Sequence, residues 1–505
     1  MRKILYEYKW GLFISCLLII NLIIYIITSF GIDSDTWFIL HNGEYILNNG
    51  FPHTNPFTIH ENLPFIITNW LTSILEYILY KYLNIFGLLL WMISGSILLL
   101  FSLYKFIDTF HQNKNPVTTF IGCIISFFVL NNFVSNRPTL ITISIILWEI
   151  IFLIFYEKTL QKKYLLYIII LCFILIQLHA SIFLVCLLPI LAFLAGNILE
   201  YLHSKNKSLK FSLCSYLPLI LAILLVACIN PYGFSSISFL YTSYVECFSQ
   251  NINLINELQT PNFISIYAIH CILHGMIGIF YIIHNKEIID KKKFFLWFGG
   301  LLLCIMAIRN YWMFYIFTLP FIIDFFNQYR SLQQQFIITI KQLLKSKFYI
   351  SILLFLLIFT FSLNCKNIHT WITQPINDTE STPLLAIEYL NITEDSKDIK
   401  IFNSFNSGGY IGFCGYPVYI DARPELYSAP KGYNNESIYT EFINIGRNTQ
   451  HDIENLIDYY DFDYMIVPNY NQNGNYSILE YYLNHTANYK IVVVGNQYKM
   501  YQKQS

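Results

Sequence analysis

Acidic and aromatic residues recur at helical spacing directly after the first long apolar run of the chain. In GIDSDTWFIL and the residues behind it, Asp33, Trp37, His41 and Glu44 follow at intervals of four, four and three. This spacing places the four side chains on one face of an α-helix, and Asp35 stands beside them. A carboxylate can act as a general base, and two carboxylates can hold a divalent metal. We therefore expect Asp33 and Asp35 to be catalytic, and we leave a metal at this pair open.

The same aspartates have a simpler explanation, because Asp and Ser commonly cap the N-terminus of a helix. Capping needs a single residue, however, and leaves His41 and Glu44 unexplained. We therefore expect Trp37, His41 and Glu44 to contact the substrate. The opposite side of the predicted helix is apolar and is expected to lie against lipid; it carries Ile39, Leu40, Ile46 and Leu47.

Further polar residues stand at the ends of later apolar runs. Arg137 and Arg309 each occupy such an end, where a guanidinium either reaches phospholipid headgroups or binds a phosphate of a substrate in a bidentate way. We expect both arginines to bind the phosphate of a donor. His179, Tyr232 and Glu257 are further candidates for substrate contact. Their simpler roles are an interfacial side chain, part of an Asn-Pro-Tyr-Gly turn and a loop acid.

The elements that must position these residues are apolar helices. Of the 505 residues, 55% are hydrophobic and only 12% are charged, against about 25% charged in soluble domains. This composition predicts a polytopic α-helical membrane protein, and the net charge of zero gives no reason to expect nucleic acid. Apolar windows predict about eleven transmembrane helices, near residues 11–30, 85–107, 117–134, 138–156, 164–179, 181–200, 211–229, 263–284, 294–308, 311–326 and 348–364.

The basic residues predict how the chain crosses the membrane. One set of loops holds nineteen lysines and arginines, whereas the opposite set holds Lys81, Arg137 and Arg309. Basic loops stay in the cytoplasm, so the N-terminus is predicted inside and every candidate residue outside. The cytoplasmic loops themselves look like plain connectors rich in lysine.

Two domains follow from this organisation. Residues 1–364 are predicted to form the multi-pass membrane domain, with a first outer loop at 31–84. Within that loop, apolar and polar residues of the segment 65–83 separate at helical spacing, which predicts a helix on the membrane surface. Residues 365–505 are more polar and predict an extracytoplasmic α/β domain. Its strands are expected in KIFNSF, PVYIDAR, YMIVPN and YKIVVVGNQYKMYQK, and its helices in HDIENLIDYY and YSILEYYLN.

One predicted strand of that domain carries chemistry. PVYIDAR holds Asp421 and Arg423, which we expect to face the first outer loop and to help shape an acceptor site. The simpler alternative is a salt bridge at the end of a strand.

Several motifs together resemble the polytopic glycosyltransferases of the GT-C superfamily. DSDTWFILHNGEYILNNGFPHTNPFT resembles their first outer loop, and NRPTL, QLHAS, INPYG, ELQTP and IRN resemble later motifs in the same order. FNSFNSGGYIGFCGYPVYIDARPELY resembles the start of their outer domain. The resemblance implies a polyprenyl-phosphate-sugar donor, an inverting transfer, and an aspartate of the first outer loop that acts as base or positions the acceptor; Asp35 matches best.

The sequence also departs from the family pattern. The histidine expected directly after the aromatic pair is displaced to His41, an acid is missing at Asn69, and Leu258 replaces an aromatic after Glu257. These changes weaken a metal site, while the acids and arginines remain.

The predicted function is transfer of a hexosyl or pentosyl group at the outer face of the cytoplasmic membrane, in the cell envelope. The donor is a polyprenyl-phosphate sugar and the acceptor a glycan, a lipid or a protein. Two other functions stay open. A glycolipid transporter or flippase would need charge inside the membrane, where Glu149 is the main exception to otherwise apolar spans. A non-catalytic scaffold would instead bind a glycan through its outer domain.

Overall fold

The computed structural model describes most of the chain in two compact units. Described are residues 31–110, 116–130, 138–204, 209–239, 241, 259–260, 266–284, 290–328, 376–428, 430–433, 435–445, 449–469 and 476–504, with isolated residues between 335 and 362. The helical unit comprises residues 1–31, 89–229 and 255–373, and the mixed unit comprises 32–88, 230–254 and 374–505. The first outer loop therefore belongs to the same compact unit as the C-terminal segment.

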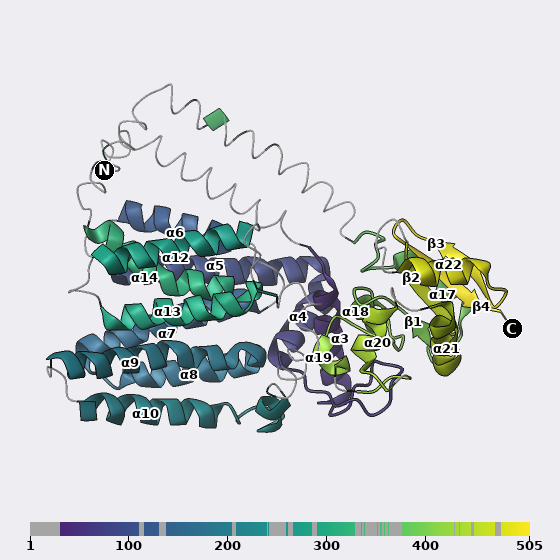
Figure 1. Ribbon diagram of the computed structural model, residues 1–505, viewed down its shortest axis with the longest axis horizontal. Coiled ribbons are helices and arrows are strands. Elements are labelled where there is room, and N and C mark those ends of the chain that lie inside the picture. The colour runs from purple at the N-terminus through teal and green to yellow at the C-terminus, as the bar shows by residue number, and fades with distance from the viewer. Residues whose placement is uncertain are drawn as a thin grey trace. The chain divides into compact units, whose positions relative to one another are not determined.

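The helical unit is a set of long helices that lie side by side (Figure 1). Neighbouring pairs include α7 with α8, α9 with α13, and α13 with α14. Its described helices are α5 (Ile85–Phe110), α6 (Pro116–Leu130), α7 (Thr139–Thr159), α8 (Lys163–Leu178), η2 (Ala180–Cys186), α9 (Leu187–Ser204), α10 (Leu209–Val226), α12 (Ile266–His284), α13 (Lys291–Met306), η4 (Ile308–Asn310) and α14 (Tyr311–Gln328).

These helices match the predicted spans wherever the chain is described. Among the described residues, three segments are long and apolar enough to cross a membrane: Ile85–Phe110, Thr139–Thr159 and Ala180–Leu202. Shorter apolar helices occupy several of the other predicted spans, among them Lys163–Leu178 and Ile272–His284. The predicted spans at 11–30 and 348–364 lie outside the described residues.

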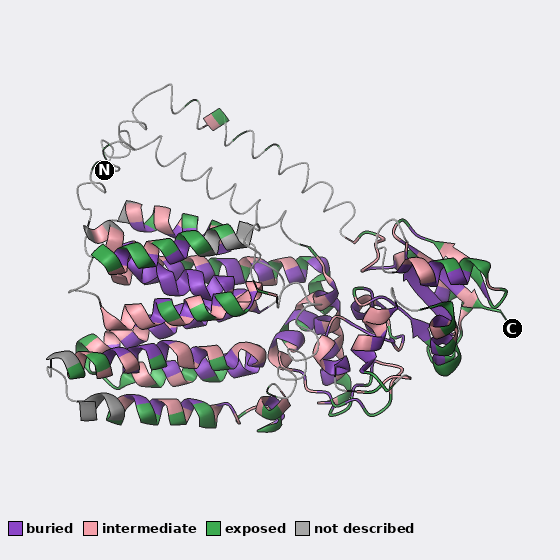
Figure 2. Ribbon diagram, in the orientation of Figure 1, coloured by how far each residue is buried: buried purple, intermediate pink, exposed green. Residues whose placement is uncertain are grey.

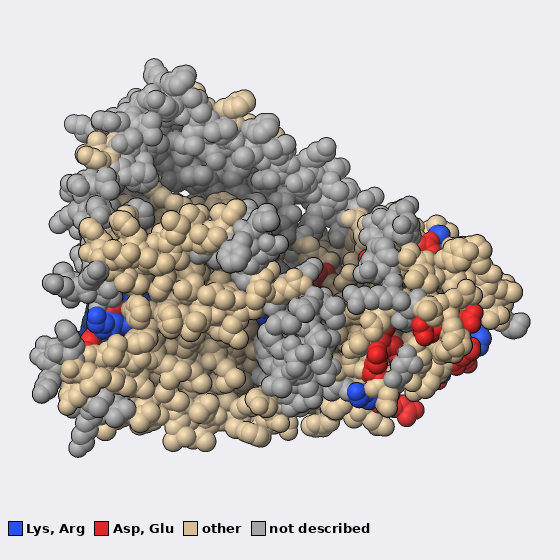
Figure 3. Space-filling view, in the orientation of Figure 1, with Lys and Arg blue, Asp and Glu red and all other residues tan. Residues whose placement is uncertain are grey.

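The surface of the helical unit is as apolar as its interior. Figure 2 shows the buried residues concentrated in the middle of the helix set, and Figure 3 shows a face almost without charge over the same helices. Leucine, isoleucine and phenylalanine side chains of α5, α10 and α12 are exposed there. In water such a surface would aggregate, whereas in lipid it is the expected one. The chain is thus an α-helical membrane protein.

The mixed unit combines the helix pair α3 (Ser34–Asn49) and α4 (Trp70–Leu83) with a small sheet. The strands are β1 (Ile401–Phe402), β2 (Tyr464–Pro468), β3 (Tyr489–Val494) and β4 (Tyr498–Lys503), in the order β1-β2-β4-β3. β1 pairs with β2 in parallel, and the other pairs are antiparallel. Its further helices are α17 (Leu384–Thr393), α18 (Gly408–Phe413), α19 (Pro424–Tyr427), α20 (Ile438–Asn444), α21 (Gln450–Tyr460) and α22 (Ser477–His485).

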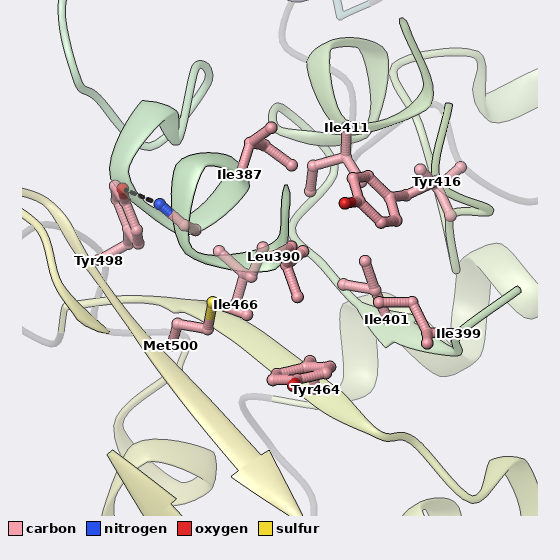
Figure 4. Close-up of a cluster of buried hydrophobic side chains, with 12 residues drawn as sticks. Ile387, Leu390, Ile399, Ile401, Ile411, Tyr416, Tyr464, Ile466, Tyr498 and Met500 are labelled. Atoms are coloured by element: carbon pink, nitrogen blue, oxygen red, sulfur yellow. Dashed lines mark hydrogen bonds between the residues drawn. The ribbon is translucent and has the colours of Figure 1, made fainter. Parts of the chain in front are cut away.

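One core holds the C-terminal part of this unit together. Side chains from α17, α18 and three strands meet in it, as Figure 4 shows, and they include Leu390, Ile401, Ile411, Ile466 and Met500. Each fully buried aliphatic side chain of this kind contributes about 1.5–3 kcal/mol. The predicted small α/β domain is present, and α21 and α22 coincide with its two predicted helices.

The predicted strand PVYIDAR is wrong. Its only ladder contacts among the described residues are single bridges from Val418 to Ile401 and to Thr58. The backbone of Val418 exchanges hydrogen bonds with the first outer loop, since its N–H donates to Phe57 and its carbonyl accepts from Ile59. The apolar run is therefore used to hold the outer loop rather than to extend the sheet. The segment 489–503 forms a hairpin of the two strands β3 and β4.

Candidate active site

Helix α3 begins where the spacing of acids predicts, and Asp33 is its N-cap. The carboxylate oxygen Oδ1 of Asp33 accepts hydrogen bonds from the backbone N–H of Thr36 at 2.9 Å and from its hydroxyl at 2.7 Å. These bonds satisfy one of the amide groups that a helix start leaves open. The capping explanation therefore holds for Asp33.

Asp35 lies in the first turn of the same helix and is half-buried. A single N-cap closes the helix, so capping does not account for this second carboxylate. Of the two predicted catalytic aspartates, only Asp33 is the N-cap of α3.

The predicted polar face of α3 turns toward the protein. Trp37 is 1% exposed. Its ring packs against Tyr410 and Phe413 of α18 at centroid distances of 4.9 and 5.2 Å, and against Tyr80 of α4 at 6.4 Å. In this structure Trp37 joins three helices, which is a packing role.

His41 and Glu44 continue this face. The ring of His41 lies 3.9 Å from that of Phe57, centroid to centroid, and burial followed by the positive charge of Arg423 lowers its pKa to about 3. Glu44 accepts a 2.8 Å hydrogen bond from the hydroxyl of Tyr77 in α4. Burial, and then this bond, raise the pKa of Tyr77 to about 12. His41 is thus neutral at pH 7, and Glu44 links α3 to α4.

The expectation that the opposite side of α3 faces lipid is wrong for three of its four residues. Ile39, Leu40 and Ile46 are buried, and only Leu47 is exposed. The helix is covered by α4 and α18, and its spacing alone could not show that both sides are inside the protein. Gly43 permits the closest contact with α4, since a Cβ there would lie 2.0 Å from the carbonyl oxygen of Ser73.

Helix α4 carries its polar residues inward. Thr72, Ser73 and Glu76 are fully buried, while Ile78 and Tyr82 are exposed. This arrangement is the inverse of a helix in water and suits a helix whose outer side meets lipid. The separation of polar and apolar residues predicted for this segment is therefore present, with the polar side against α3.

Glu76 is the site residue that sequence reasoning did not single out. Both of its carboxylate oxygens are buried, and neither has a hydrogen-bond partner in the described part of the chain. Burial raises the pKa of Glu76 well above its usual value, and the negative charge of Asp33 adds to that effect. The available signal was an acid among apolar residues at the spacing that faces α3.

Asp421 and Arg423 form a buried pair that faces the first outer loop, as predicted. Nε of Arg423 donates to Oδ1 of Asp421 at 2.9 Å, and Nη2 of Arg423 bonds the other oxygen. The guanidinium lies over the rings of Phe38 and Phe65, which belong to that loop. The alternative predicted a salt bridge at a strand end; the salt bridge is present, but the segment is not a strand.

Tyr232 belongs to the turn that its motif predicts. The Asn230 side chain accepts from the backbone N–H of Tyr232 at 2.9 Å and donates to the Gly233 carbonyl at 3.1 Å. The Tyr232 ring is buried against Phe51 and His53, each 5.7 Å away between centroids. Its present role is to hold the first outer loop.

In the helical unit, three motifs distant in sequence meet at one end. The Thr142 hydroxyl, two residues beyond NRPTL, forms a 2.8 Å hydrogen bond with Nδ1 of His179 in QLHAS. Gln177 of QLHAS donates to the carbonyl of Ile229 in INPYG at 2.6 Å. His179 is thus bonded in the way that its simpler, interfacial explanation requires.

Arg309 belongs to the same end. Helix α13 starts beside the end of α7, where Lys292 pairs with Glu157 at 3.2 Å, and runs back toward Arg309. There the N–H of Ile308 donates to the carbonyl of Gln259, which joins the IRN and ELQTP motifs.

The lysines at the opposite end are not plain connectors. Lys292 pairs with Glu157 and Glu200, and Lys293 pairs with Asp324. These pairs tie α7, α9, α13 and α14 together. Arg137 and Glu257 lie outside the described residues.

The described residues of the candidate site do not provide a full set of metal ligands. Within the described residues, no group of three or more His, Cys, Asp or Glu side chains is arranged to hold an ion. Asp33 already accepts two hydrogen bonds at one oxygen. We therefore derive no step through a metal.

No known family model matches this sequence, and no curated protein matches it. Solved structures nevertheless share its fold. ArnT from Cupriavidus metallidurans in the apo state aligns with a TM-score of 0.56 at 8% identity, covering 97% of this chain and 97% of that chain. The Archaeoglobus fulgidus oligosaccharyltransferase tethered with an acceptor peptide aligns with a TM-score of 0.54 at 13% identity, covering 99% of this chain and 74% of that chain. The chain therefore has the GT-C fold that its motifs predict.

Proposed function

We propose that this protein is a membrane glycosyltransferase that moves a sugar from a polyprenyl-phosphate donor to an acceptor at the outer face of the cytoplasmic membrane. The observation that carries the proposal is the alignment of nearly the whole chain with two proteins of the GT-C fold, one of them an oligosaccharyltransferase. The position of Asp35 in the first turn of α3 supports it.

In the proposed reaction Asp35 takes the proton of the acceptor hydroxyl. The acceptor oxygen forms a bond to the anomeric carbon while the bond from that carbon to the phosphate oxygen breaks, with inversion. The polyprenyl phosphate leaves with the bonding electrons. We assign Arg137 and Arg309 to this phosphate, because guanidinium groups stabilise the charge that develops on it.

The test compares the two aspartates in membranes supplied with labelled polyprenyl-phosphate sugars. Asn remains a good N-cap, so Asp33→Asn is a matched control that keeps the bonds to Thr36. Asp35→Asn should fold normally and lower the rate of transfer by about 10²–10⁴-fold, the usual contribution of a general base. Full activity of Asp35→Asn, alone and combined with Asp33→Asn, would refute the assignment.

One observation favours transport as a second function. Glu149, midway along α7, is completely buried and has no hydrogen-bond partner among the described side chains. Acids inside membrane helices often mark transport pathways. If glycolipid moved across proteoliposomes without chemical change, and Glu149→Gln stopped that movement, transport would replace transfer.

A further inference from the structure

The guanidinium of Arg423 is held rigidly by one carboxylate. Asp421 is 2% exposed and accepts from the backbone N–H of Arg423 at 3.1 Å, from its Nε at 2.9 Å and from Nη2. The Tyr427 hydroxyl adds a fourth bond to Asp421 at 3.1 Å. The bidentate pair is electrically neutral as a whole, and the plane of the guanidinium is set by it.

Two phenylalanines cover the guanidinium. The Cζ atom of Arg423 lies 5.1 Å from the ring centroid of Phe38 and 4.8 Å from that of Phe65. Both rings come from the first outer loop segment of the mixed unit, residues 32–88. These contacts attract the cation to the rings and fix its distance from α3.

One donor of this otherwise bonded group is left over. Nη1 of Arg423 is buried and has no hydrogen-bond partner in the part of the chain that the structure describes. An unpaired buried donor costs about 1–3 kcal/mol, and more when it is charged. A donor of this kind in a rigid cluster is suited to bind a ligand.

Arg423 packs on a residue of α3 that is close to the proposed base along the helix. Phe38, under Arg423, is three residues beyond Asp35 on α3. Residues at this spacing are neighbours on a helix surface, with Cβ atoms about 5–6 Å apart. Asp35 is therefore a neighbour on α3 of the residue whose ring Arg423 covers.

We propose that the acceptor is a sugar, with one hydroxyl bonded to Asp35 and a neighbouring hydroxyl accepting from Nη1 of Arg423. This inference rests on the proposed function and names its acceptor class. Asp421 already balances the charge of Arg423, so Nη1 requires no anion. A hydroxyl both donates and accepts, and neighbouring hydroxyls of a sugar ring match a paired acceptor and donor. Because Phe65 covers the guanidinium here, its ring must turn aside when the sugar binds.

The test measures binding separately from transfer. The affinity of the purified full chain for methyl hexosides and methyl pentosides is determined by ligand-observed NMR. Arg423→Lys keeps the charge beside Asp421 but removes the fork, and Asp421→Asn with Arg423→Gln replaces the ion pair by two amides. Each should weaken glycoside binding by about tenfold or more, the value of one hydrogen bond to a charged group. Lys490→Gln, on the exposed face of β3, is the matched surface control.

Competing ligands decide the chemical class. Phosphorylated glycosides and a threonine-containing peptide are measured beside the neutral glycosides. The inference is overturned if no neutral glycoside binds the native chain, if both Arg423 variants bind it normally, or if the native chain binds only the phosphorylated form or the peptide. Failure of the proposed function is a different result, since it appears as transfer by Asp35→Asn whatever the glycosides do.

Discussion

Two clusters in the mixed unit differ in whether their buried polar groups are paired. Between α3 and α4, several buried atoms have no hydrogen-bond partner among the described residues: Ser34 Oγ, Trp37 Nε1, Asn42 Oδ1, Ser73 Oγ and both carboxylate oxygens of Glu76. In the C-terminal part, Asn403 donates to Ser404 and Ile420 and accepts from Tyr419. Glu441 likewise accepts from Tyr419 and Tyr433.

This difference distinguishes residues with a structural role from residues with a role in function. Unpartnered buried groups lower stability, and they persist where a ligand, an ion or a second conformation uses them. The helix pair that carries Asp35 holds several of them, and Arg423 Nη1 is another in the C-terminal part, whereas Asn403 and Glu441 are bonded. We infer that the cluster around Asn403 and Glu441 belongs to the support on which the helix pair is mounted.

The largest effect is expected from closing the gap between the two helices. Gly43→Ala places a Cβ 2.0 Å from the carbonyl oxygen of Ser73, and overpacking of this kind costs about 1–3 kcal/mol, occasionally more. The thermal midpoint in detergent should fall clearly. Gly275→Ala is the control, because nothing lies within 4 Å of its Cβ. Equal midpoints for both variants would mean that α3 and α4 are not packed as described.

A pH dependence comes next, and its sign follows from His41. Burial, then Arg423, lower its pKa from 6.5 to about 3 in the folded chain. Below pH 6.5 His41 is protonated in the unfolded chain but stays neutral in the folded chain, so the free energy of unfolding falls as pH drops toward 3. By pH 5 the loss in the free energy of unfolding should approach about 2 kcal/mol, because each pH unit contributes about 1.36 kcal/mol.

His41→Phe should flatten this part of the curve of thermal midpoint against pH. His53→Gln, at an exposed position, should leave the curve unchanged. A curve that kept its slope without His41 would assign the dependence to another group.

The two buried acids provide a matched pair. Glu76 has a raised pKa and no hydrogen-bond partner among the described residues, so the free energy of unfolding of the native chain should decrease as pH rises above 4.5, the ordinary pKa of a glutamate. Glu76→Gln should raise the thermal midpoint at pH 7 and lose that advantage below pH 4.5. Glu441→Gln keeps one accepting oxygen in place of two, so it should lower the free energy of unfolding by about 1–2 kcal/mol and with it the thermal midpoint. A rise in the thermal midpoint for Glu76→Gln and a fall for Glu441→Gln would support the contrast between the two acids. A fall for both variants would contradict it.

The smallest effect is expected from two serines. Ser73→Ala removes a buried hydroxyl without a partner and should leave stability unchanged or slightly higher. Ser404→Ala removes a hydroxyl that donates to Ser407 at 3.1 Å and should cost about 1 kcal/mol. The two variants are compared by their denaturation midpoints in the same detergent. A larger loss of stability for Ser73→Ala than for Ser404→Ala would contradict the prediction.

Local pattern was enough to predict much of the architecture. The spacing from Asp33 to Glu44 predicts a helix there, and α3 spans Ser34–Asn49. The same spacing could not show that Trp37 and Ile39 are both buried. An apolar helix side has the same sequence pattern whether it packs against protein or lies against lipid. The prediction of a strand around Val418 was wrong for a related reason. Its backbone hydrogen-bond partners lie in the first outer loop, far away in the sequence.

By itself the sequence determined the apolar helices, the helix that follows the first apolar run, and the order of motifs that predicts a GT-C fold. Composition and periodicity are local quantities, and helices of this length form from them. Only the tertiary structure decided that Asp33 is a cap, that Glu76 is buried without a partner, and that Arg423 lies over Phe38. Those facts depend on which residues of distant segments meet, and that is settled by packing rather than by the spacing within any one segment.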